Sequence, residues 1–165
     1  MSYLIYAAYG SNLLKERFMV YIKGGMYRGW EYSGSKDKTE PQDLGWMYVP
    51  HRLYFAKSSS KWANKGVAFL SCEKEKDSSF HAVVRLWKVS QQQFEDIKKQ
   101  EGRWYDVELE LGEKDGFIIK TITGCWKTEI NKPSEEYLNI IRQGLKETTK
   151  GWSEDKIEEY LRKFL

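Results

Sequence analysis

Two stretches of the chain carry residues whose types and spacing could do chemistry. The first is Tyr9-Gly10-Ser11-Asn12, which follows an apolar segment and precedes an amphipathic one. The pattern predicts a strand, a tight turn with positive φ at Gly10, and a helix capped by Ser11 or Asn12. Such a turn exposes backbone N–H groups without partners, so it could bind a carboxylate or a phosphate. A plain strand-to-helix connection with a good cap would explain the same residues.

The second stretch is Glu101-Gly102, at the end of a helix that the sequence predicts to begin after Ser90. Ser90 and Gln93 have the spacing of a capping box, and Gly102 suits the position after the last turn. Glu101 would then face the negative end of the helix dipole, where a carboxylate is locally unfavourable. A residue that is locally unfavourable at its position in a helix indicates a functional role. The alternative is an exposed Glu101 paired with Lys98.

Several other kinds of site lack their sequence signatures. The chain has no phosphate-binding glycine loop, no dinucleotide fingerprint and no nucleophile elbow. Its two cysteines, Cys72 and Cys125, are far apart in the sequence, and its two histidines are His51 and His81. We therefore expect no metal site and no Ser-His or Cys-His pair. A carboxylate acting as acid and base is the chemistry that the composition permits most easily.

Length and composition indicate one soluble domain spanning residues 1–165. The chain is 41% hydrophobic and 31% charged, with a net charge of +3. No apolar run has the length of a membrane span, and no signal-peptide pattern is present. We expect a cytoplasmic protein with reduced thiols and no membrane partner. The charge is too small to argue for a nucleic-acid partner by electrostatic steering.

The order of predicted elements favours an α+β fold. The apolar run 3–8 predicts a strand buried on both faces. Residues 26–45, within an insertion at about 20–46, predict a long irregular loop in which aromatic and basic residues alternate. Further patterns predict strands at 46–49, 52–56, 66–70 and 80–89, a helix after Ser90, a hairpin over 104–126, and helices after Ser134 and Ser153. This order does not alternate as a βαβ fold would, so we expect a mostly antiparallel sheet that could close into a barrel.

The residues Tyr6-Ala7-Ala8-Tyr9-Gly10-Ser11-Asn12 resemble the signature opening of the γ-glutamylcyclotransferases, Y-F-A-Y-G-S-N. Further similarities follow in the same order along the chain, at 52–55, at 65–68, at the strand and helix that lead to Glu101-Gly102, and from Pro133 onward. The resemblance covers nearly the whole chain except the 20–46 insertion. It implies a small mixed β-barrel, closed or nearly closed, with flanking helices.

This resemblance also implies an activity, the conversion of γ-glutamyl amino acids or γ-glutamylamines to 5-oxoproline and a free amine. The segment from Tyr6 to Asn12 would bind the glutamyl end of the substrate, and Glu101 would be the general acid and base. Trp126 stands where the family has a substrate-contacting tyrosine, and it offers no hydroxyl. The chemistry suits these roles, because the substrate's own α-amine attacks its own γ-carbonyl. One carboxylate can serve both proton transfers, so no enzyme nucleophile, metal or organic cofactor is needed.

The expected partner is therefore a small γ-glutamyl substrate, bound by a monomer or homodimer. Two other readings stay open. One is a catalytically silent module of the same fold that binds a γ-glutamyl or other small anionic ligand. The other is an interaction domain for nucleic acid or protein that uses the aromatic residues of 26–48 as a stacking surface.

Overall fold

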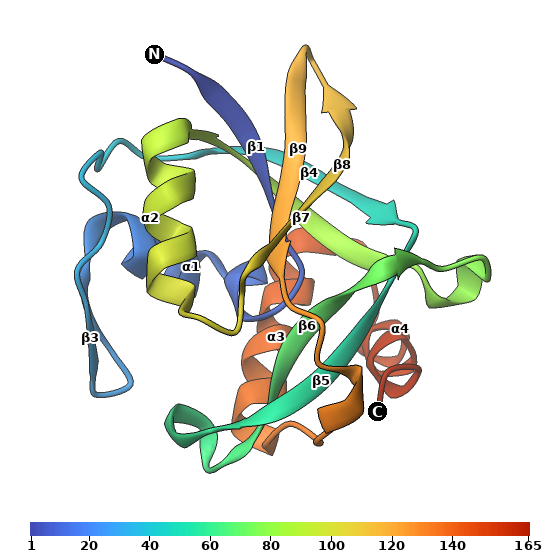
Figure 1. Cartoon of the computed structure of the whole chain (residues 1–165). Coiled ribbons are helices and arrows are strands. Elements are labelled where there is room, and N and C mark those ends of the chain that lie inside the picture. The colour runs from blue at the N-terminus through green and yellow to red at the C-terminus, as the bar shows by residue number, and fades with distance from the viewer.

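The chain folds as an α+β protein in which helices flank a mixed sheet (Figure 1). The computed structural model describes all residues, 1–165. Its strands are β1 (Tyr3–Ala8), β2 (Gly25–Tyr27), β3 (Trp30–Tyr32), β4 (Gln42–Val49), β5 (His51–Ser59), β6 (Lys65–Lys74), β7 (Ala82–Ser90), β8 (Val107–Lys114) and β9 (Phe117–Thr123). Its α-helices are α1 (Lys15–Lys23), α2 (Gln91–Glu101), α3 (Glu135–Thr149) and α4 (Glu154–Arg162), and a short 3-10 helix, η1 (Ser11–Leu13), precedes α1. None of these helices is long and apolar enough to cross a membrane.

Strand β1 is the centre of a five-stranded sheet with the order β4-β7-β1-β9-β8. It pairs antiparallel with β7 and parallel with β9, so the sheet is mixed. Leu4, Tyr6 and Ala8 belong to a core shared with α1 and α2, whereas Ile5 and Ala7 belong to a larger core shared with α3 and α4. The prediction of a strand buried on both faces is confirmed.

The strands do not close into a barrel, and this part of the predicted fold class is wrong. Strands β5 and β6 form a separate two-stranded sheet beside the end of β9. At that junction the Thr123 hydroxyl donates to the Leu70 carbonyl at 2.7 Å and accepts from the Leu70 amide at 2.8 Å. A side chain therefore satisfies the backbone groups that a neighbouring strand would have paired, and the ladder of the sheet ends there.

The region expected to be an irregular loop contains regular structure. Strands β2 and β3 form a hairpin whose turn residues, Arg28 and Gly29, have φ of 51° and 82°, and β4 already begins at Gln42. The Arg28 guanidinium lies 4.0 Å from the ring centroid of Trp62 and pairs with Glu136. These contacts fix the hairpin against the body of the protein. The sequence hid the turn because Arg-Gly is not one of the usual hairpin pairs.

The helix boundaries follow their predicted caps. Ser90 and Gln93 form the expected capping box at the start of α2, and Ser134 and Ser153 cap α3 and α4. In the middle of α3, Gly144 lies against η1, where a Cβ atom would stand 2.6 Å from the Leu13 Cβ. Without this glycine, α3 could not approach the turn so closely.

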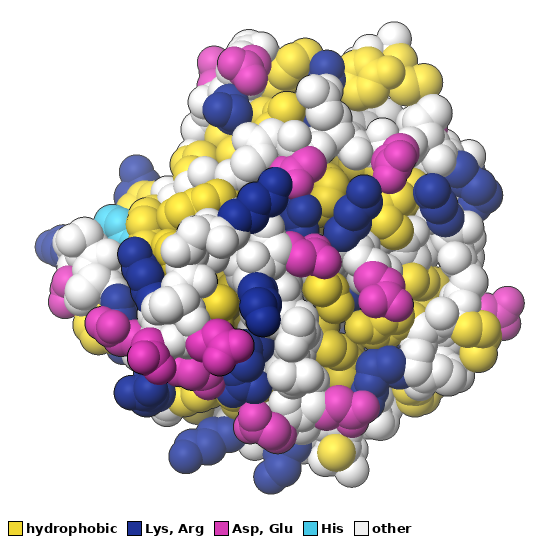
Figure 2. Space-filling view, turned by 180° about the vertical axis from the view of Figure 1, so that it is seen from behind, with side chains coloured by type: hydrophobic (Ala, Val, Ile, Leu, Met, Phe, Trp, Pro, Cys, Tyr) yellow, Lys and Arg dark blue, Asp and Glu magenta, His cyan; other side chains and the backbone are white.

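Charged side chains of both signs lie on the face that Figure 2 shows. Asp and Glu gather toward the lower left of this view, with Lys and Arg beside them, and apolar side chains lie between the charges elsewhere. This face is therefore not of one sign.

Candidate active site

The turn after β1 is held by its own backbone and by a close neighbour. The Leu13 amide donates to the Gly10 carbonyl at 3.0 Å, and the Leu14 amide donates to the Ser11 carbonyl at 3.2 Å. Gly10 has φ of −118°, so the expected positive φ is wrong. Glycine gives the turn space instead, because a Cβ atom would make a tight contact of 3.0 Å with the Ala68 Cβ.

Asn12 connects this turn to the predicted acid–base residue. Neither η1 nor α1 has a side-chain cap, so the expected capping by Ser11 or Asn12 is wrong. The Asn12 Nδ2 instead donates to the Tyr6 hydroxyl at 3.0 Å and to Glu101 Oε1 at 3.2 Å. The Asn12 Oδ1 is buried and has no hydrogen-bond partner, which leaves an acceptor beside the carboxylate.

Glu101 is the last residue of α2, and its carboxylate points inward. Its Oε2 accepts from the Tyr21 hydroxyl at 3.3 Å, and the same hydroxyl accepts from Arg17 Nη2 at 2.9 Å. Lys98 pairs with Glu108 at 2.9 Å. The alternative of an exposed Glu101 paired with Lys98 is therefore wrong.

The surroundings of Glu101 favour its protonated form. Burial of the carboxyl raises its pKa above the ordinary value. The charge of Arg17, the hydrogen bond from Tyr21, the charge of Lys61 and the hydrogen bond from Asn12 each oppose this effect only in part. A raised pKa makes the carboxylate a stronger base and keeps its protonated form available as a donor to a higher pH than in an exposed glutamate.

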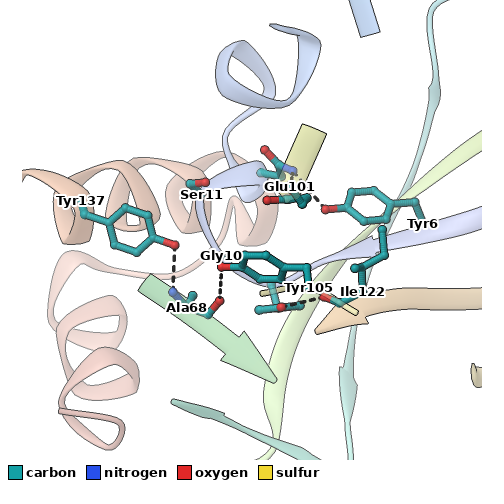
Figure 3. A pocket seen from close by; sticks show the side chains of 10 residues that line it. Tyr6, Gly10, Ser11, Ala68, Glu101, Tyr105, Ile122 and Tyr137 are labelled. Carbon is teal, nitrogen blue, oxygen red and sulfur yellow. Dashed lines mark hydrogen bonds between the residues drawn. The ribbon is translucent and has the colours of Figure 1, made fainter. Parts of the chain in front are cut away.

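Glu101 and the turn line one small inner cavity, which has a volume of about 30 Å³ (Figure 3). Two tyrosines on its wall bond to the backbone of Ala68. The Tyr105 hydroxyl donates to the Ala68 carbonyl at 2.9 Å, and the Tyr137 hydroxyl accepts from the Ala68 amide at 3.0 Å. Burial raises the pKa of Tyr137 to about 12, so this hydroxyl stays neutral. The lining consists of Tyr6, Tyr9, Gly10, Ser11, Asn12, Ala68, Glu101, Tyr105, Ile122 and Tyr137.

An outer groove of about 320 Å³ adjoins the inner cavity. The two spaces share Ser11, Glu101, Tyr105 and Tyr137. Other residues that line the groove are Arg17, Tyr32, Ser58, Ser59, Ser60, Lys61, Trp62, Val67 and Trp104. Together they form one continuous site that opens from Glu101 toward the surface.

Arg17 gives the outer groove an unusual charge. It is only 4% exposed, yet its Nε and Nη1 have no hydrogen-bond partner. Its guanidinium lies 4.6 to 5.0 Å from the ring centroids of Tyr21, Tyr27 and Tyr32, which stabilise the cation through their π faces. Lys61 adds a second positive charge that is not part of any ion pair. Glu101 is the one carboxylate in the lining, so the groove is suited to an anionic group.

The structure brings together most of the residues predicted from the sequence, and separates three. Ala7 and Ala8 are buried in β1 and do not line the cavity. Trp126 lines neither space, and its indole N–H donates to the Trp104 carbonyl at 2.8 Å. The predicted residues that share the cavity are Tyr6, Tyr9, Gly10, Ser11, Asn12 and Glu101.

The residues around Glu101 that were not predicted from the sequence include Arg17, Tyr21, Tyr105 and Tyr137. Arg17 and Tyr21 stand four apart in α1, a spacing that places both side chains on one helix face. That signal was present in the sequence. Tyr105 and Tyr137 reach the cavity only through the tertiary fold, and no local pattern marks them.

Comparison with solved structures identifies the fold. A structure named γ-glutamyl cyclotransferase matches 95% of this chain and 87% of its own, with a TM-score of 0.70 and 20% identity. An uncharacterised human protein matches 96% of this chain and 88% of its own, with a TM-score of 0.69 and 21% identity. YkqA from Bacillus subtilis matches 98% of this chain and 54% of its own, with a TM-score of 0.61 and 14% identity. This chain has the γ-glutamylcyclotransferase-like fold, and the resemblance predicted from its motifs is confirmed for the fold.

Sequence comparison gives a different kind of relative. No family model matches the chain. Histone deacetylase 5 of Arabidopsis thaliana is 33% identical in an alignment of 133 positions that covers 73% of this chain. The match spans only 20% of that protein's length. The name of the longer protein therefore refers to a chain of which the matched segment is only one-fifth.

Proposed function

We propose that the protein is a γ-glutamylcyclotransferase-like enzyme that cyclises a γ-glutamyl group to 5-oxoproline and releases an amine. One observation carries the proposal: the Glu101 carboxylate shares a cavity with the Gly10–Ser11 turn and is held there by Asn12 and Tyr21. An acid–base group and an anion-binding turn are the two components that this reaction needs.

The size of the inner cavity limits how the substrate can lie. A space of about 30 Å³ is close to that of one water molecule, so it admits only a small end group. The substrate α-carboxylate is such a group, and the N–H groups at the start of η1 together with neutral tyrosine hydroxyls suit it. The rest of the substrate would occupy the outer groove.

Glu101 would carry the protons of the reaction. It accepts a proton from the substrate α-ammonium, which Asn12 Oδ1 can orient by accepting a hydrogen bond. The free amine attacks the γ-carbonyl carbon, a C–N bond closes the five-membered ring, and the bond to the leaving amine breaks. Glu101 delivers this proton to the leaving nitrogen as that bond breaks. It then takes the second proton from the ring nitrogen, which leaves the neutral lactam, and passes it to the released amine, which departs as an ammonium. Each proton removed is delivered, so one carboxylate serves both steps.

The charge of the outer groove favours a leaving amine that carries a carboxylate, that is, an amino acid. Arg17 and Lys61 both line this space, and Glu101 is the only acidic residue in the lining. A γ-glutamyl amino acid offers a carboxylate there, whereas a simple γ-glutamylamine does not. A matched pair, γ-glutamylalanine and γ-glutamylethylamine, tests this preference.

The experiment is an assay of 5-oxoproline release from a panel of γ-glutamyl amino acids and γ-glutamylamines. We expect the wild type to release 5-oxoproline and Glu101→Gln to lose about 100-fold or more of kcat. Glu95→Gln is the matched control, because Glu95 is exposed on the same helix and the change is the same. Absence of release by the wild type, or release that survives Glu101→Gln, contradicts the proposal.

A catalytically silent binding module of the same fold is the second candidate. The observation that favours it is the match to one-fifth of a longer protein with a different name. Such a module would bind γ-glutamyl compounds in calorimetry without releasing 5-oxoproline. The cytoplasmic location, the monomeric or homodimeric state and the absence of a cofactor or nucleic-acid partner belong to the enzyme proposal as further expectations.

A further inference from the structure

Cys72 and Cys125, which are 53 positions apart in the sequence, come together at the surface of the protein. Their Sγ atoms lie 2.6 Å apart. Cys72 is partly exposed in β6, and Cys125 is exposed just after β9. They line a hollow of about 190 Å³ together with Tyr54, Ser71, Glu73, Lys127 and Thr128. The hollow shares no residue with the inner cavity or the outer groove.

The backbone around both cysteines is fixed by hydrogen bonds. Two residues before each cysteine, Thr123 bonds through its hydroxyl to both backbone groups of Leu70. On either side of Cys125, the Tyr54 hydroxyl donates to the Gly124 carbonyl at 2.6 Å and accepts from the Trp126 amide at 2.9 Å. The two sulfurs are therefore neighbours because the fold holds their main chains in place, and not because two flexible loops happen to meet.

We infer that Cys72 and Cys125 are a reversible dithiol–disulfide pair that responds to a small disulfide such as oxidised glutathione. The covalent bond would join β6 to the segment after β9, where hydrogen bonds of the Thr123 and Tyr54 hydroxyls now connect the β5–β6 sheet to the end of β9 and the residues after it. This site is independent of the proposed catalytic function.

The exchange has two balanced steps. The more exposed Cys125 attacks one sulfur of oxidised glutathione as a thiolate, forms a mixed disulfide and releases one glutathione. Cys72 then loses its proton to solvent, attacks the Cys125 sulfur and releases the second glutathione. Both cysteines are oxidised and one glutathione disulfide is reduced to two thiols. Burial and the neighbouring thiol raise the pKa of Cys72 to about 12, which suits it to the resolving role rather than the first attack.

The test equilibrates the full-length protein with glutathione buffers of increasing oxidised share, quenches with an alkylating reagent, and measures intact mass. We expect the wild type to lose both alkylation sites, to retain no glutathione and to remain uncrosslinked between chains. Half of the native protein should be oxidised at a ratio of oxidised to reduced glutathione at least about tenfold lower than the ratio that the same chain needs in urea. The reason is that the fold holds the two sulfurs together.

Single variants separate this pair from two unrelated surface thiols. Cys72→Ser should retain one glutathione on Cys125, since no resolving thiol remains, and Cys125→Ser should react more slowly. Thermal unfolding of each variant confirms that it is folded. Alkylation at both sites in every buffer, stable glutathione on the wild type, chain-to-chain crosslinks, or equal oxidation of the native and urea-unfolded chain would each overturn the inference.

Discussion

The close approach of α3 to the turn at Gly10–Asn12 gives the sharpest test of how the candidate site is built. The change is Gly144→Ala, in the interior of α3. A Cβ atom there would stand 2.6 Å from the Leu13 Cβ and 2.7 Å from both the Leu13 carbonyl carbon and the Leu14 amide nitrogen. Two of these three atoms are backbone, so the turn itself must move.

Two opposing effects set the magnitude. Alanine in place of glycine stabilises a helix interior by about 1 kcal/mol. Overpacking against fixed atoms costs about 3 kcal/mol, the upper part of its usual range, because backbone cannot rotate away. The net loss is about 2 kcal/mol, which for a chain of this size lowers the melting temperature by roughly 4 to 8 °C. Because displacement of η1 also moves Asn12 from Glu101, we expect kcat/KM for 5-oxoproline release to fall by about tenfold or more.

Calorimetry and the 5-oxoproline assay measure the two effects on the same preparation. Gly151→Ala is the control, since its Cβ would meet only the Thr149 carbonyl oxygen, at 3.8 Å. That variant should melt and turn over like the wild type. If Gly144→Ala is as stable and as active as Gly151→Ala, the turn is not positioned by α3 and the reasoning is wrong.

Three further predictions follow from contacts of the site and of the thiol pair. Burial raises the pKa of Glu101, so the folded wild type loses stability as the pH rises through that pKa and the buried carboxyl ionises. Glu101→Gln carries no such charge, so its melting temperature should exceed that of the wild type at pH 8 and differ little from it at pH 4. Tyr21→Phe removes a hydrogen bond to the ionised carboxylate, so the acidic limb of the pH–rate profile should move to higher pH. Oxidation of Cys72 and Cys125 closes a loop of more than 50 residues, worth about 4 kcal/mol, so dithiothreitol should lower the melting temperature of the oxidised wild type but not that of Cys72→Ser.

Patterns of neighbouring residues in the sequence correctly predicted those parts of the fold that depend on short-range interactions. The Ser90 capping box and the two-sided burial of the first strand were visible in the residues themselves. The failure of the sheet to close into a barrel was not visible in the sequence, because it depends on hydrogen bonds between the Thr123 side chain and Leu70 of another strand. The turn at Arg28 was also hidden, since a non-glycine residue at positive φ is held by tertiary contacts with Trp62 and Glu136.

The same distinction holds for the candidate site. Glu101 stood out because it breaks the helix-dipole rule, and the structure places it inside the cavity with the predicted turn. The predicted role of Trp126 followed from alignment to a family pattern, and the indole lies outside the lining. Tyr105 and Tyr137 were missed because their hydroxyls meet at Ala68 only after three distant segments have packed.

The length of helix α2 determines where Glu101 lies relative to the turn. Strand β7 pairs Ser90 with Tyr3, so the helix starts level with the beginning of β1. Its 11 residues span about 16 Å and return the chain along β1, whose six residues span about 20 Å, to the level of the turn. Adding or deleting one residue in α2 would rotate Glu101 by about 100° about the helix axis and out of the cavity. In this fold, the length of one helix is therefore as strict a requirement for the geometry of the candidate site as the identity of the carboxylate at its end.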